Sequence, residues 1–155
     1  MRNWCASSVR SILRVVRMPG TARCLLVEAA LWLGIARLCV LALPYRWVVT
    51  VLSLRDRADG PSAAAETEEA IAQVIWAVAT AARHTPWESN CLARAIAAKV
   101  MLRRRRIGST LSLGVRKGPE ALTAHAWLSR DQSPLVGGAE VFRYAVVWTS
   151  GEGGQ

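Results

Sequence analysis

The sequence predicts an α+β protein in which helices come first and a small antiparallel sheet follows. Through most of the chain, apolar residues recur at helical spacing, whereas the last third alternates apolar and polar residues over short runs. Turn-forming Gly, Pro, Asp and Ser separate those short runs, as they do between neighbouring strands. Helices segregated from an antiparallel sheet define the α+β class.

The composition is that of one folded domain with a strong positive charge. At 155 residues, 52% of them hydrophobic, the chain is long enough for a proper core. Its formal net charge is +9, from 20 Lys and Arg against 11 Asp and Glu. This excess of basic residues favours acidic partners. The alternative is an ordinary solvent-exposed surface on which arginine takes the place of lysine.

The chain is expected to hold an N-terminal helical region, residues 1–57, and a core, residues 66–150, in one compact unit. A turn-rich linker with Asp59-Gly60-Pro61-Ser62 separates them. Within the first region, residues 1–23 mix arginine with helically spaced apolar residues.

Residues 24–43 are the most hydrophobic segment and nearly long enough to cross a membrane. Glu28 and Arg37 interrupt the run, so we expect a helix that buries against the domain or a partner, with peripheral membrane contact as the alternative. Pro44 stops this helix, and residues 45–54 predict a short amphipathic one.

Two further helices and four strands complete the expected elements. The first helix starts with acidic residues near 66 and ends near His84, which we expect to cap it or to lie on the surface. The second runs from Cys91 through Arg104, and its arginine-rich end suits the helix dipole. The expected strands are 109–116, 122–129, 134–137 and 141–148.

Cys91 lies where a loop becomes a helix. Unpaired N–H groups and the positive end of the dipole meet there, and they favour the thiolate, the nucleophilic form of cysteine. The Cys91 N–H is the expected first donor of an oxyanion hole. A side chain of Ser89 or Asn90 is a candidate second donor, and both residues equally suit a plain N-cap.

His125 shares one face of its predicted strand with Trp127. Its neighbours Ala124 and Ala126 are expected to point into the core, so the imidazole can face the helix start and act as base to Cys91. A cysteine that opens a helix and a histidine on a later strand is the layout of papain-like and transglutaminase-like enzymes.

Four segments in this order resemble the transglutaminase-like leader peptidases of lasso-peptide biosynthesis, the microcin-processing family. They are C-L-A-R-A at 91–95, the arginine run at 103–106, T-L-S-L-G-V at 110–115 and A-H-A-W at 124–127. The resemblance extends over roughly residues 71–148.

The resemblance implies a cysteine protease that cuts the leader from a precursor peptide before macrolactam closure. It implies three partners: the precursor, a separate leader-recognition protein and an asparagine-synthetase-like cyclase. The reduced thiols expected for this chain favour a cytoplasmic location. We expect no metal and no other cofactor. The runner-up function is a catalytically weak basic scaffold or membrane adaptor of a peptide-maturation complex.

The third catalytic group departs from the family pattern. The family commonly has an aspartate about twelve residues after the histidine, and Gly137 stands there. Glu140 is the preferred substitute, with Asp131 or a backbone group as alternatives. Trp87 and Trp127 flank the site and are expected either to line a peptide groove or to pack in the core.

Metal binding, disulfides and nucleic-acid binding are not expected. The two histidines and four cysteines form no C-x-x-C pair or tight cluster, so reduced thiols are expected. The arginine run at 103–106 is short and has no interleaved aromatic residues, which argues against a nucleic-acid site.

Overall fold

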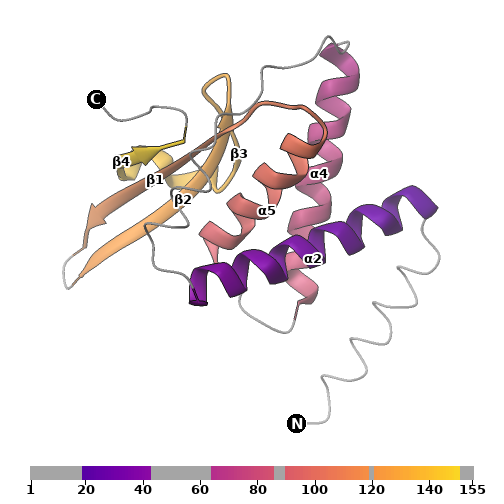
Figure 1. Ribbon diagram of the computed structural model, residues 1–155. Helices are drawn as coiled ribbons and strands as arrows, with labels where there is room; N and C mark the ends of the chain where they lie inside the picture. The colour runs from indigo at the N-terminus through magenta and orange to yellow at the C-terminus, as the bar shows by residue number, and fades with distance from the viewer. Residues whose placement is uncertain (1–18, 43–63, 86–89, 119–120, 151–155) are drawn as a thin grey trace.

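The computed structural model describes residues 19–42, 64–85, 90–118 and 121–150, with the side chains of 64–66, 139 and 140 left out. In those ranges, three long helices pack beside a four-stranded antiparallel sheet (Figure 1). The helices are α2 (Gly20–Ala42), α4 (Ala64–His84) and α5 (Cys91–Arg104). The strands are β1 (Thr110–Lys117), β2 (Leu122–Arg130), β3 (Ser133–Val136) and β4 (Ala145–Thr149). The expected α+β class is confirmed.

One hydrophobic core joins all three helices to one face of the sheet. Alanines face the interior along α5, and small side chains let neighbouring backbones approach closely. The largest fully buried side chains come from every layer: Leu33 on α2, Val74 and Val78 on α4, Met101 and Leu102 on α5, and Leu111 and Leu128 on the sheet.

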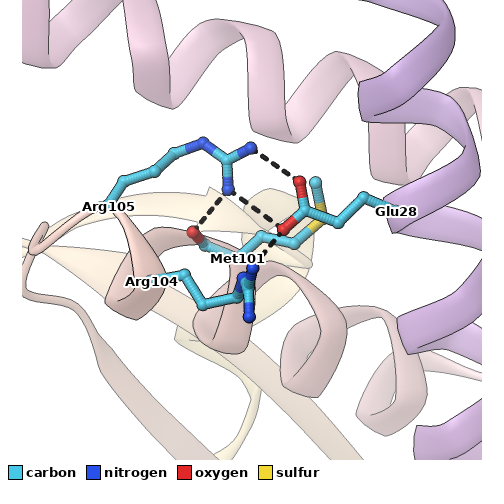
Figure 2. A network of polar contacts seen from close by, with 4 residues as sticks. All are labelled: Glu28, Met101, Arg104 and Arg105. Carbon is cyan, nitrogen blue, oxygen red and sulfur yellow. Dashed lines mark hydrogen bonds and ion pairs between the residues drawn. The ribbon is translucent and has the colours of Figure 1, made fainter.

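An ion-pair network fastens α2 to the C-terminal end of α5 (Figure 2). Arg105 donates to Glu28 at 2.7 Å and also to the Met101 carbonyl at 2.8 Å, while Arg104 lies 3.2 Å from the other Glu28 oxygen. The hydrogen bond from Arg105 is the largest influence that holds the pKa of Glu28 below its ordinary value. Glu28, which interrupts the apolar run of α2, therefore makes a tertiary contact with a part of the chain that is distant in sequence.

The expected helix at 24–43 is confirmed, starting a few residues earlier, and it is only partly covered by protein. Leu26, Ala29, Leu33 and Ala36 pack into the core, whereas the opposite face is exposed. By length and composition alone α2 could cross a membrane, a test that core helices also pass.

The sheet has the strand order β3-β2-β1-β4, and its last strand differs from the prediction. Residues 141–148 do not form one strand, because a 3₁₀ helix, η1 (Gly138–Arg143), precedes β4, which begins at Ala145. Gly137, in the left-handed region with φ 76°, turns the chain out of β3 into η1. The chain then crosses from one edge of the sheet to the other, so β4 pairs with β1.

The expected helix in residues 1–23, apart from its last five residues, the short helix at 45–54 and most of the linker lie outside the described residues. Cys24, Cys39 and Cys91 carry free thiols, and Cys5 lies outside the described residues.

Candidate functional site

The start of α5 is shaped by an N-cap at Asn90. The backbone of Asn90 is extended, and its side-chain oxygen accepts a hydrogen bond from the Ala93 N–H at 3.0 Å. The Asn90 carbonyl receives the first helical bond, from Arg94. The N–H groups of Cys91 and Leu92 therefore have no acceptor within the helix, which is the arrangement that an oxyanion can use. Of the two roles expected for Asn90, the structure shows the capping one.

The imidazole of His125 is held by a main-chain carbonyl. Its Nε2 atom lies 2.8 Å from the Gly137 oxygen. A carbonyl oxygen only accepts hydrogen bonds, so Nε2 carries the proton and the neutral ring has its lone pair on Nδ1. A backbone group was one alternative for the third catalytic group, and the Gly137 carbonyl contacts the His125 ring in this way.

Two aromatic rings flank His125 on its face of the sheet. Tyr144, just after η1, lies 5.0 Å away between centroids, and Trp127 lies 6.2 Å away in a stacked arrangement. Trp127 is only 5% exposed, so it serves mainly as packing and offers little surface to a substrate. Gly114, paired with His125 across β1 and β2, makes room for these rings, since a Cβ there would lie 2.9 Å from Trp127 and from Tyr144.

Cys91 and His125 lie toward the same end of the sheet. Lys99 on α5 donates to the Ser109 carbonyl at 2.7 Å, just before Thr110, which pairs with Ser129. From that anchor, α5 extends about 12 Å back to Cys91 and β2 about 13 Å back to His125. Figure 1 shows the start of α5 at the end of the sheet where β2 begins.

The two side chains nevertheless approach this end from different sides. Cys91 is half-buried and packs against the core under the helices, as do Ala126 and Leu128 of β2. His125 points to the other face of β2, toward Trp127 and Tyr144. Among the described residues, no hydrogen bond joins the thiol and the imidazole. Ala126 faces the core as expected, whereas Ala124 is exposed.

From the sequence, a turn at residues 130–133 is expected to pair Gly138 with His125, and the structure shows that this register is wrong. A bulge between Leu128 and Ser129 shifts β3, whose last paired residue is Val136, so Gly138 does not lie across from the histidine. Glu140 lies in η1 instead of on a strand, and its side chain is not described. Its role as the acid stays a prediction. Asp131 is in the β2–β3 turn with its side chain 89% exposed, 3.4 Å from Arg130.

Three candidates from the sequence remain: Trp87, Ser89 and His84. Trp87 and Ser89 lie outside the described residues, so their roles stay predictions. His84 is exposed and its Nδ1 lies 2.8 Å from the Thr80 carbonyl, which confirms the capping role.

Sequence reasoning missed Tyr144, which packs against His125, and Arg116, which contacts Tyr144. Tyr144 follows η1 and belongs to no recognisable pattern. Arg116, on the same face of β1, places its guanidinium 5.3 Å from the Tyr144 ring centre, a cation–π contact. Because side chains alternate along a strand, Arg116 and Gly114 are expected on the same face of β1. Tyr144 reaches these two residues only because the chain crosses the sheet through η1.

Comparison with known proteins identifies a family. The profile of the transglutaminase-like superfamily matches residues 35–149, well over half of the chain, including α4, α5 and all four strands. The comparison with curated proteins gave no match, and the comparison with solved structures gave none. The superfamily includes cysteine proteases and transferases that use a cysteine, a histidine and an aspartate. The helix-opening cysteine, the strand histidine and the family match agree: this chain belongs to the transglutaminase-like superfamily.

Proposed function

We propose that this protein is a cysteine peptidase, with Cys91 as nucleophile and His125 as general base and acid. The observation that supports the proposal best is the hydrogen bond between His125 Nε2 and the Gly137 carbonyl. That bond leaves the Nδ1 lone pair to take the proton of the thiol. Cys91, for its part, opens α5, beside the unpaired N–H groups of the first helical turn.

The reaction follows from these two groups. The Cys91 thiolate attacks the carbonyl carbon of the scissile peptide bond, and the oxyanion is met by the N–H groups at the start of α5. The C–N bond breaks as the imidazolium gives its proton to the departing amine. Water then attacks the thioester, His125 takes its proton, and the thiol leaves with that proton. The proposal requires substrate binding to bring the thiol and the imidazole within hydrogen-bond reach, from the different sides of β2 on which they lie in this structure.

The proposed substrate is the precursor of a lasso peptide, cut between leader and core. This finer assignment is supported by the four segments at 91–95, 103–106, 110–115 and 124–127 that resemble the leader peptidases of that pathway. The acyl portion held on Cys91 is then the leader, and the released amine is the new N-terminus of the core peptide. A separate recognition protein presents the leader, and an asparagine-synthetase-like cyclase consumes the freed core. The reaction is proposed to take place in the cytoplasm.

Mass spectrometry of a precursor incubated with this protein and a recognition partner tests the proposal. We expect leader and core fragments that together add one water to the precursor. Cys91→Ala removes the nucleophile, so incubation of the precursor with this variant should yield no fragments. The circular dichroism spectrum of the variant should match that of wild type. Cleavage by Cys91→Ala at the wild-type rate contradicts the peptidase assignment.

A second candidate is a basic scaffold or membrane adaptor with little catalysis. It is supported by the exposed apolar face of α2 and by a His125 ring whose hydrogen bond, in the described part of the chain, goes to a carbonyl and not to a carboxylate. The two candidates differ in one measurement. A thiohemiacetal formed with a peptide aldehyde, or alkylation of Cys91 by a peptide chloromethyl ketone, favours the peptidase, whereas an unreactive Cys91 favours the scaffold.

A further inference from the structure

The outer face of α2 carries a continuous apolar stripe. Its members recur every three or four residues along one side of the helix, and they are 39–67% exposed: Val27, Leu31, Ile35, Leu38 and Leu41. The residues that enter the core lie on the opposite side. A helix that is apolar all round is normally buried on all sides, so this stripe calls for a covering layer.

Arginines border the stripe. Arg23 is exposed beside its first turn, and Arg37 lies half-buried along its other half. Arg104 reaches over from α5, 62% exposed, and is held there by its 3.2 Å contact with Glu28 (Figure 2). An open groove at this end combines apolar Val27 and Leu31 with Arg23 and Arg104. Apolar side chains beside guanidinium groups match a lipid that has an acyl chain and an anionic headgroup.

We propose that α2 lies in the surface of an anionic bilayer, with this stripe inserted among the lipids. The whole chain supports that partner, because its net charge of +9 is attracted to a negative surface. The helix lies on the membrane and does not cross it, since Leu26, Ala29, Leu33 and Ala36 are engaged in the protein core.

Two other occupants fit less well. A second copy would bring another +9 charge and a second arginine border against the first. A partner peptide helix normally docks in a groove, whereas Ile35, Leu38 and Leu41 continue the stripe along the rounded outer side of α2. A deformable bilayer accepts such a surface along its length.

Flotation with lipid vesicles tests the proposal without any catalytic readout, so its failure is separate from failure of the peptidase assignment. The probes are vesicles of phosphatidylcholine alone and vesicles with about a third phosphatidylglycerol. We expect the full-length protein to float with the anionic vesicles, and to float less in high salt, because salt screens the arginines.

A matched pair of variants locates the binding. Leu31→Glu with Leu38→Glu places two charges in the stripe, and Ala72→Glu with Ala79→Glu places the same charges, at the same spacing, on exposed positions of α4. The stripe variant should lose binding by about tenfold or more, while the α4 variant stays close to wild type. Circular dichroism checks that both fold.

Four outcomes would overturn the proposal. Three of them concern flotation: the wild-type protein floats with neither vesicle type, it floats equally with both, or the stripe variant floats like wild type. The fourth is a wild-type dimer that the stripe variant alone abolishes, which assigns the stripe to a second copy.

Discussion

The residue that best defines the site is His125, because its surroundings set its protonation pattern. The Gly137 carbonyl fixes the proton on Nε2, and Tyr144 packs against the ring at 5.0 Å. A carbonyl orients an imidazole as a carboxylate does, but with only a partial charge it stabilises the imidazolium less. If no carboxylate joins it, turnover should be slower than in an enzyme with a complete triad.

Replacing the two histidines separates catalysis from capping. His125→Ala should remove nearly all peptidase activity, since the thiol loses its base and the leaving amine its acid. His84→Ala should keep most activity, because that ring only caps α4 through the Thr80 carbonyl. The measurement is the rate of leader release for each variant at equal concentration of folded protein. An active His125→Ala beside an inactive His84→Ala would reverse the assignment.

Gly137 is required by backbone geometry, so restoring the family's aspartate there should harm the protein. Its φ of 76° disfavours any side chain, and a Cβ would lie 2.8 Å from the Ala126 carbonyl. Gly137→Ala should lower the free energy of unfolding by about 1–2 kcal/mol, and Gly137→Asp should lower it by a similar amount. The control is Gly20→Ala, where a Cβ meets nothing within 4 Å. Urea unfolding measures both, and a neutral Gly137→Ala would show that the turn relaxes freely.

At the scale of elements, the contact between α2 and α5 depends on a carboxylate shared by two arginines. The hydrogen bond from Arg105 to Glu28 connects residues 77 apart in sequence. Sequence reading identified the arginine-rich end of α5 as a helix-end feature. The structure shows that two of those arginines also hold α2 (Figure 2).

Glu28→Gln should lower stability in a pH-dependent way. The pKa of Glu28 is lowered in the folded protein, so its contribution is fully present above the unfolded pKa and is lost as pH falls through the folded pKa. At neutral pH the variant should lose about 0.5–1 kcal/mol, because solvent around Arg104 screens part of the attraction. The difference from wild type should vanish in acid.

Thermal unfolding from neutral to acidic pH measures this effect. Glu69→Gln is the control, since that carboxylate is exposed on α4 and accepts a hydrogen bond from the neighbouring Gln73. A stability loss that stayed constant down to the acid limb would mean that packing, and not charge, explains the effect of Glu28→Gln.

At the scale of the whole molecule, α2 belongs to the same core as the sheet. Leu33 is fully buried in the cluster that contains Leu111 and Leu128. This packing makes α2 part of the cooperative structure. The family match, which begins within α2, is consistent with that arrangement.

Leu33→Ala should therefore destabilise the entire domain. The cavity should cost about 2–5 kcal/mol, and helix and sheet signals should still unfold in one transition. Leu31→Ala, on the exposed stripe two residues away, should change stability by less than about 0.5 kcal/mol. Chemical unfolding followed by far-ultraviolet circular dichroism and tryptophan fluorescence measures both. Two separate transitions would show that α2 folds as a unit of its own.

What the sequence by itself determined was local: the three described helices, the β1–β2 pair, the capped start of α5 at Cys91 and the position of His125 on a strand. Periodicity, caps and turn residues carry that information within a few neighbouring residues. The family resemblance carried the choice of Cys91 and His125 as the reactive pair.

Only the tertiary structure decided what lies around those residues. The bulge in the β2–β3 pairing, the left-handed Gly137 and the crossing of η1 place β4 beside β1 and bring Tyr144 over His125. The direction of the His125 side chain was settled in the same way: it lies on the face of β2 that carries Trp127, opposite to the face on which Ala126 packs in the core. The physical reason is that strand pairing joins residues far apart in sequence, so register and sheet order depend on the whole core and not on local pattern.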